Sequence, residues 1–248
     1  MTLSTFDYIA AITEHSAGFA DATRDNLTAR VEHCPDWSVA DLVRHLTEVH
    51  WFWGTIVEEL LDEPPEEGRR PAHAEEDGLV DAFVAGAQRL VQVLREADQS
   101  AHAWTWASWQ QDVAFVTRHQ VQEAAVHHWD AVNAAGGSLD IAPDVAADSI
   151  DEFLHFSVAS EDDPDDPPET ALDGTLAFRA TDTDDAWTLV DGDRPGTARV
   201  LRGVGDDAPV LSGTASDLLL WLYQRKDLDA GAVPDDLVKR FRAICFTD

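Results

Sequence analysis

The stretch RHQVQEAAVHHWDA, residues 118–131, decides the fold of the first half of this chain. Alanine, valine, glutamine and glutamate dominate it, and neither glycine nor proline interrupts it, so it is predicted to be helical. It places His119, Glu123 and His127 four residues apart, and residues with this spacing lie one above another on a helix. A column of imidazole, carboxylate and imidazole therefore runs along a largely apolar helix.

This column, which Asp130 extends, has two interpretations. It is either the solvent-facing side of the helix or a polar seam that points into a helical bundle. In the second case an imidazole and a carboxylate at i and i+4 can share one metal ion, as in the metal sites that bundles build from facing helices. Glutamate and neutral histidine suit Zn²⁺, and also Ni²⁺ or Fe²⁺. Periodicity alone leaves both interpretations open.

A metal in such a seam needs a further ligand from another helix, and the segment DLVRHLTEVH, residues 41–50, offers one. His45 follows Leu42 by three positions and so lies on the apolar side of the predicted helix. A lone histidine on an apolar face is more often a core residue than a ligand. The case for His45 improves because a second helix supplies Glu and His. His50, four positions after Leu46, is a weaker candidate for lining the same cavity.

The first half of the chain is predicted to contain four helices of about twenty residues, which suggests a four-helix bundle. Ser38 and Asp41 form a capping-box-like pair at the start of the second helix, and Gly136 and Gly137 end the fourth. The expected helices cover residues 4–24, 38–61, 79–97 and 112–135.

The second half changes character and is predicted to be a small α+β domain. An acidic segment, residues 161–169, is expected to be a solvated, mobile loop. We place the domain boundary so that residues 1–138 form the bundle and residues 139–248 form the α+β domain. Helices are expected at 144–158, 214–229 and 234–246, and strands at 175–181, 186–191, 198–203 and 208–213.

Composition limits the partners. The 248 residues include 17 Lys and Arg against 48 Asp and Glu, which gives a net charge of −31. A surface this acidic repels the phosphate backbone of nucleic acids and the headgroups of anionic lipids. Neither nucleic acid nor a membrane is therefore expected as a partner. Cys34 and Cys245 form no disulfide framework, and no basic leader or long apolar run is present. These features favour a cytoplasmic location.

Three stretches resemble one known family. CPDWSVADLVRHLTEVHWF (34–52), AWTWASW (103–109) and RHQVQEAAVHHWDA (118–131) resemble the mycothiol-dependent maleylpyruvate isomerase family of the DinB-like metal-dependent four-helix-bundle superfamily. GTASDLLLWLYQR (213–225) is similar to the end of that family's C-terminal domain. The resemblance implies an α+β protein overall, with a DinB-like four-helix bundle followed by a small α+β domain like that of sterol carrier proteins.

The resemblance also implies site residues. The metal ligands would be His45, Glu123 and His127. His119 and His128 would then be additional histidines that do not bind the metal. The family's isomerase has a catalytic arginine that we expect after the second helix, where Arg69 and Arg70 lie in a segment rich in proline and glutamate.

The function implied by this resemblance is activation of mycothiol, a low-molecular-weight thiol. Three protein ligands leave a tetrahedral Zn²⁺, or another divalent ion such as Ni²⁺, with one open position. The activated thiol would add to a small-molecule electrophile, either in cis–trans isomerisation of maleylpyruvate or in S-transfer. Two alternatives stay open: a metal-assisted hydrolase and a non-catalytic metal- or ligand-binding or regulatory protein. The protein is expected to be a monomer or a homodimer.

Tryptophans gather near the predicted site. Trp51 and Trp53 lie on the second helix, and Trp104, Trp106 and Trp109 precede the fourth. They either form an apolar wall over the metal or serve ordinary packing between helices.

Overall fold

The computed structural model describes residues 3–160, 162–163, 167–231 and 233–246, and the chain divides into two compact units. The helical unit consists of Leu3–Trp106 and Gln110–Asp140, and the C-terminal unit contains Ala107–Trp109 and Ile141–Asp248. The predicted α+β fold is confirmed. The domain boundary between residues 138 and 139 stays a prediction, as does the mobility of the acidic loop, of which residues 161 and 164–166 lie outside the described part.

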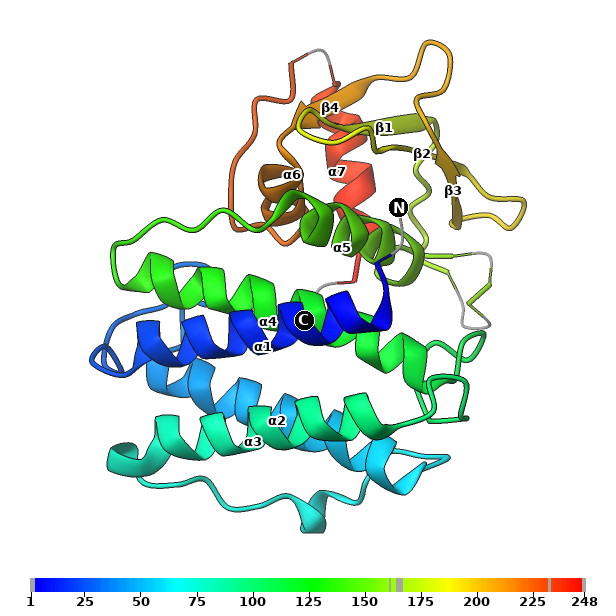
Figure 1. The fold of residues 1–248 in the computed structure, drawn as a ribbon. Coiled ribbons are helices and arrows are strands. Elements are labelled where there is room, and N and C mark those ends of the chain that lie inside the picture. The colour runs from blue at the N-terminus through cyan, green and yellow to red at the C-terminus, as the bar shows by residue number, and fades with distance from the viewer. Residues whose placement is uncertain (1–2, 161, 164–166, 232, 247–248) are drawn as a thin grey trace. The chain divides into compact units, whose positions relative to one another are not determined.

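Four long helices form the helical unit (Figure 1). In Figure 1 the connection between α2 and α3 returns along the bundle, so these two helices run in the same direction and pack side by side. α1 and α4 form the other pair. The helices are α1 (Thr5–Thr23), α2 (Val39–Glu59), α3 (Leu79–Glu96) and α4 (Val113–Ala134), with the short 3₁₀ helices η1 (Glu67–Arg69) and η2 (Glu76–Gly78) between α2 and α3.

A capping box starts α2, as predicted. The backbone N–H of Ser38 donates to Asp41 Oδ2 at 3.0 Å, and the backbone N–H of Asp41 donates to Ser38 Oγ at 3.3 Å. The hydrogen bonds from Ser38 also lower the pKa of Asp41. Because the cap fixes the first residue of the helix, it also fixes the direction in which His45, two turns later, points.

The core of the helical unit consists of aliphatic and aromatic side chains from all four helices. Burying each large side chain of this kind contributes about 1.5–3 kcal/mol to stability. This core holds α2 against α3 and supports the backbone on which the candidate site is built. Its fully buried members include Phe19, Leu42, Val43, Leu46 and Phe83.

Two ring contacts show the register between α2 and α4. The His45 and His127 rings lie 5.0 Å apart between centroids, and the Trp53 and His119 rings lie 5.9 Å apart. Eight residues forward on α2 therefore correspond to eight residues backward on α4, so the two helices are antiparallel. This register brings the histidine of α2 to the level of the polar column of α4.

The C-terminal unit combines helices with a four-stranded sheet of order β3-β2-β1-β4. β1 pairs antiparallel with β2 and parallel with β4, and β2 pairs antiparallel with β3. Phe178 on β1 pairs with Trp187 on β2 and Leu211 on β4, and all three are buried. The elements are α5 (Pro143–Phe156), β1 (Thr175–Ala180), β2 (Ala186–Asp191), β3 (Ala198–Arg202), β4 (Val210–Gly213), α6 (Ala215–Leu222) and α7 (Asp235–Ala243).

The helix predicted over residues 214–229 is wrong in length, because α6 ends at Leu222. Gln224 has a φ of 59°, and the backbone N–H groups of Gln224 and Arg225 donate to the carbonyls of Trp221 and Leu220. This is a Schellman ending with glutamine at the left-handed position, where glycine is usual. No glycine marks the end of the helix, so the sequence signal for it was missing. The last helix also ends early, at Ala243.

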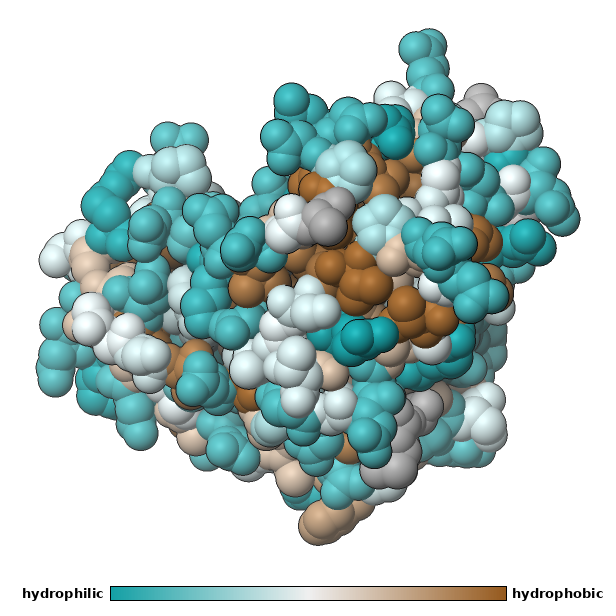
Figure 2. Space-filling view, turned by 90° about the horizontal axis from the view of Figure 1, so that it is seen from above, coloured by the Kyte–Doolittle hydropathy of each residue, from teal (hydrophilic) through white to brown (hydrophobic). Residues whose placement is uncertain are grey.

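Hydrophilic side chains predominate on the face drawn in Figure 2, with apolar side chains gathered in patches between them. Among the described residues, we find no helix that combines the length and the apolar character needed to cross a membrane.

Candidate metal centre

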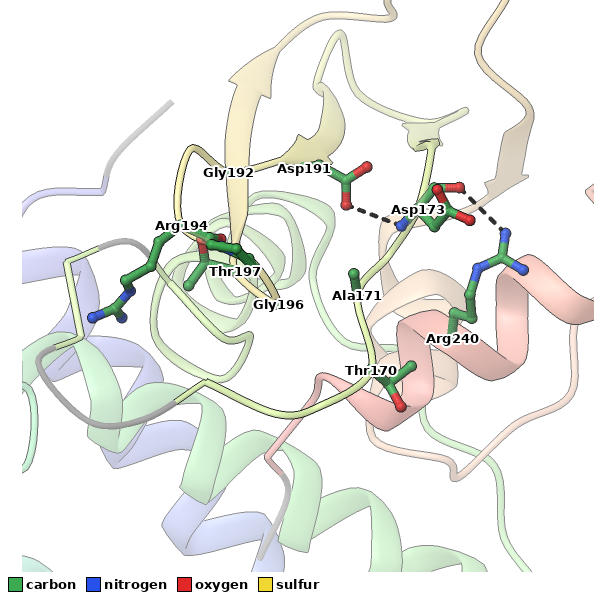
Figure 3. A pocket seen from close by; sticks show the side chains of 10 residues that line it. Thr170, Ala171, Asp173, Asp191, Gly192, Arg194, Gly196, Thr197 and Arg240 are labelled. Atoms are coloured by element: carbon green, nitrogen blue, oxygen red, sulfur yellow. Dashed lines mark hydrogen bonds between the residues drawn. The ribbon is translucent and has the colours of Figure 1, made fainter.

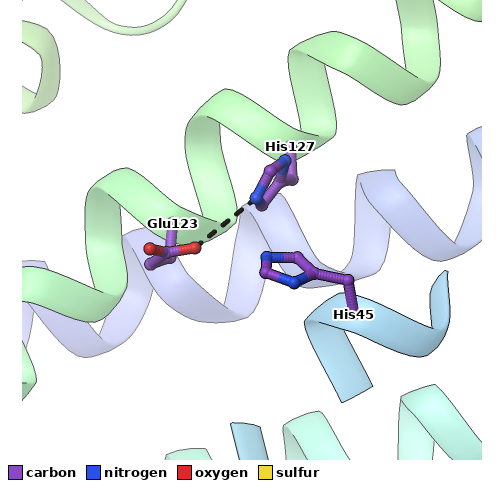
Figure 4. Close-up of side chains that lie close together, drawn as sticks. All are labelled: His45, Glu123 and His127. Atoms are coloured by element: carbon purple, nitrogen blue, oxygen red, sulfur yellow. Dashed lines mark ion pairs between the residues drawn. The ribbon is translucent and has the colours of Figure 1, made fainter. Parts of the chain in front are cut away.

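His45, Glu123 and His127 converge inside the helical unit (Figure 4). One nitrogen or oxygen from each side chain lies within 4.8 Å of those of the other two. His127 Nε2 is 3.5 Å from Glu123 Oε2, and the His45 ring meets the His127 ring edge to face. α2 thus provides one imidazole and α4 the carboxylate and the second imidazole. That this trio of residues binds a metal stays a prediction.

The polar column of α4 points into the protein, so the solvent-facing interpretation is wrong. His119 is 8% exposed, His127 is 9% exposed and Asp130 is 1% exposed, whereas the Glu123 side chain between the two histidines is 21% exposed. Periodicity could not distinguish the two cases because α4 is buried on almost every side, including positions such as Val121 and Ala125.

Neighbouring side chains on α4 orient the two histidines of the column, His119 and His127. Asp130 Oδ2 lies 3.1 Å from His127 Nδ1, which leaves His127 Nε2 directed at Glu123. Gln122 Nε2 lies 2.9 Å from His119 Nδ1, and His119 Nε2 lies 3.6 Å from Glu123 Oε1. The two oxygens of Glu123 therefore face different histidines. Partners of this kind fix the ring orientation of metal-binding histidines and raise their basicity.

Glu123 is held as a carboxylate. Burial by itself raises the pKa of this group, but the hydrogen bond from His119 and the charges of His127, His119 and His45 outweigh burial and lower the pKa to about 2. An ionised carboxylate is a competent metal ligand at neutral pH, whereas a protonated one is not.

The donor set fits a divalent ion. Two nitrogens and one carboxylate oxygen are ligands typical of catalytic Zn²⁺, and Ni²⁺ also accepts imidazole. Ligand atoms about 2.0–2.1 Å from a tetrahedral Zn²⁺ are about 3.3 Å apart. His127 Nε2 and Glu123 Oε2 are 3.5 Å apart, and the ligand atoms of all three residues lie within 4.8 Å of one another. The three side chains would therefore have to draw closer together around such an ion.

The other histidines of this region, His128 and His50, are not members of the trio. His128 Nδ1 is 3.1 Å from His15 Nδ1 on α1, and Gly18 leaves room for the His128 ring, because a Cβ at position 18 would lie 2.2 Å from it.

His50 is fully buried and stacks on Phe83 at 5.3 Å. Neither of its ring nitrogens has a hydrogen-bond partner among the described residues. Burial, assisted by His127 and His45 and opposed by Glu123, lowers the pKa of His50 to about 4.

We expect His50→Leu to raise the free energy of unfolding at pH 7 by about 1–3 kcal/mol, since it removes two unsatisfied buried nitrogens. The pKa of His50 is below its unfolded value of 6.5, so the unfolded state binds the proton first as the pH falls from 6.5 to 4. The wild type therefore loses stability over this range, and the variant should lose less. Urea unfolding at pH 7 and pH 5 measures both effects. The surface variant His102→Leu serves as control, and a less stable His50→Leu protein would contradict this account.

The sequence did not indicate which side chains Arg69 and Arg70, the two arginines after α2, contact. Arg69 pairs with Glu59 at 2.5 Å and Arg70 pairs with Glu48 at 2.9 Å. It also assigned no role to Asp130, although its spacing of three from His127 on one helix face was a usable signal. Gln122 stands three residues after His119, so the same spacing signal was available for that pair.

A second candidate site, a cavity of about 460 Å³, lies in the C-terminal unit (Figure 3). Three of its four charged side chains, those of Asp191, Arg194 and Arg240, are already bonded to the protein. Asp191 accepts the backbone N–H groups of Asp173 and Gly174, and Arg240 donates to the backbone carbonyl of Asp173 at 3.5 Å. Arg194 reaches back to the carbonyl of Ser160. These contacts hold loops together, and we assign no chemistry to this cavity.

Fold and site together define a class of protein: a four-helix bundle with a candidate His/Glu/His metal centre, joined to a small α+β unit. The model of the mycothiol maleylpyruvate isomerase N-terminal domain family matches residues 9–132, half of the chain. The chain belongs to this family.

Solved structures agree on the fold. A mycothiol-dependent maleylpyruvate isomerase and a point mutant of it superpose on this chain with TM-scores of 0.56 and 0.60. Each match is 12% identical and covers 95% of this chain and 98% of the other. No curated protein matches the chain by sequence.

Proposed function

We propose that this protein is a metal-dependent enzyme that activates a low-molecular-weight thiol, mycothiol, for addition to an electrophile. The reaction is either cis–trans isomerisation of maleylpyruvate or transfer of the thiol to another acceptor. The observation that carries the proposal is the convergence of His45, Glu123 and His127 in a bundle of this family. The choice of mycothiol as the thiol, and of isomerisation as one possible reaction, is based on the structural neighbours, which are named as mycothiol-dependent maleylpyruvate isomerase.

The three residues would hold the ion, and their neighbours would keep them in position. A bound Zn²⁺ or Ni²⁺ would supply one thing, removal of the proton from a coordinated thiol whose pKa is otherwise near 8.5. Asp130 would hold His127 in the tautomer that presents Nε2, and His119 would keep one oxygen of Glu123 away from the ion.

The thiol chemistry balances without another reagent. In isomerisation the thiolate sulfur bonds to one carbon of the conjugated double bond, and the electron pair of that bond moves onto the carbonyl. The carbon–carbon bond is then single and rotates. Return of the electron pair re-forms the double bond in the trans geometry and expels the thiolate. In S-transfer the adduct instead takes up a proton and leaves with the thiol attached.

We expect turnover of maleylpyruvate, or of another electrophile, to require both mycothiol and the metal. The test compares product formation with and without thiol, and before and after removal of the metal by a chelator and its replacement. We expect activity to be lost when the thiol is left out and when the metal is removed. Added Zn²⁺ should restore the activity of the metal-free protein. Activity without thiol would instead indicate a hydrolase, and a metal-loaded protein with no turnover would indicate a binding protein.

A further inference from the structure

Trp37 lies against the one member of the trio that α2 provides. Its indole ring and the His45 ring are 4.9 Å apart between centroids, and their planes are tilted by 51°. The His45 ring also meets the His127 ring edge to face at 5.0 Å. The imidazole from α2 therefore contacts an aromatic side chain as well as a second member of the trio.

Backbone hydrogen bonds fix the position of Trp37 relative to α2. The N–H of Trp37 donates to the carbonyl of Cys34 at 2.8 Å, and the carbonyl of Trp37 accepts the N–H of Val31 at 3.1 Å. The next residue, Ser38, is the N-cap of α2. The start of α2 thus sets both the place of the indole and the direction of His45, two turns further on.

Packing accounts for the bulk of Trp37, because this partly buried side chain packs against the core of the helical unit. An aromatic ring does more than fill space where its neighbour carries positive charge. The face of an indole is negative and attracts a cation within about 6 Å of the ring centre. A neutral imidazole gains little from this attraction. An imidazole bound to a divalent ion shares the positive charge of that ion, and it gains more.

We propose that Trp37 is a positioning residue of the metal centre, which strengthens metal binding by favouring the metal-bound form of His45. This inference rests on the part of the proposed function in which the trio binds a divalent ion. An interaction that is stronger in one of two states shifts the equilibrium towards that state. The contact should therefore raise the affinity for the ion. Because Trp37 acts through His45, turnover at saturating metal should change by less than about twofold in its variants.

Two substitutions separate the aromatic face of Trp37 from its bulk. Trp37→Phe and Trp37→Met both leave a smaller apolar side chain, but only phenylalanine keeps an aromatic face. Competition with a chromophoric chelator measures the Zn²⁺ affinity of the full chain. We expect Trp37→Met to weaken Zn²⁺ binding about tenfold and Trp37→Phe to weaken it about threefold or less. A role in packing alone would instead give both variants the same Zn²⁺ affinity, and urea unfolding of the metal-free proteins measures that role separately.

Trp109→Met is the matched control, because Trp109 is another partly buried tryptophan and its ring stacks on Phe156 in the C-terminal unit. It should bind Zn²⁺ like the wild type. Equal affinities of the two Trp37 variants, wild-type affinity in Trp37→Met, or a comparable loss in Trp109→Met would overturn the inference and leave the metal centre in place. A wild type that binds no Zn²⁺ would overturn the proposed function together with this inference, so the two failures are distinguishable.

Discussion

Replacement of His127 by alanine is expected to abolish metal binding and to reduce thiol-dependent turnover by at least about a thousandfold. His127 is one of only two nitrogen ligands in the trio, and its loss leaves a carboxylate and one imidazole on separate helices. Metal assistance is worth several kcal/mol in the transition state, and each 1.36 kcal/mol corresponds to a factor of ten in rate. Metal analysis and initial rates on the same preparation measure both effects.

The neighbouring His128→Ala variant provides the matched control. It removes a histidine one position away whose ring faces His15 on α1 and not the trio. It should retain the metal and most of the activity. Circular dichroism of both variants separates loss of the site from loss of the fold. Full metal content in His127→Ala, or loss of metal in His128→Ala alone, would show that the wrong histidine has been assigned.

Replacement of Asp130 by asparagine is expected to weaken metal affinity by about 10–100-fold while leaving the three ligands in place. The carboxylate accepts a hydrogen bond from His127 Nδ1 at 3.1 Å and is 1% exposed. Asparagine keeps the size of the side chain but removes its charge, so the imidazole becomes a weaker donor to the ion. Competition with a chromophoric chelator measures the change in affinity.

The control for this substitution is Asp81→Asn, which changes an exposed aspartate that pairs with Arg24 on the surface of the helical unit. It should bind the metal like the wild type. Because Asp130 acts through His127, activity at saturating metal should fall much less than in His127→Ala. An affinity equal to that of the wild type would mean that the Asp130 contact does not orient a ligand.

Local signals in the sequence were sufficient for much of the fold. The helical periodicity of the first half, the Ser38 cap and the paired glycines after the fourth helix gave four helices close to their observed bounds. Such signals are local because capping and periodicity depend on residues within a few positions. The end of α6 was missed for the same reason, since glutamine at position 224 adopts a left-handed conformation without the glycine that normally announces it.

The geometry of the candidate site was only partly predictable. The spacing of Glu123 and His127 put them on one face of one helix, but the approach of His45 depends on the antiparallel register of α2 and α4, which no local signal encodes. Whether the polar column faced water or the interior was equally a question of tertiary packing. The role of the tryptophans was undecided for this reason too, and the structure separates Trp106, beside His119, from Trp109.

The most direct test of this account is the metal content of the wild-type protein, purified without a histidine tag, measured by mass spectrometry beside His45→Ala. His45 is the one member of the trio on α2, so it tests the convergence of the two helices as well as the identity of the ligand. The account predicts about one Zn²⁺ or Ni²⁺ per chain in the wild type and its loss in the variant. A wild-type protein that binds no metal even after reconstitution, or a variant that keeps a full complement, would contradict it.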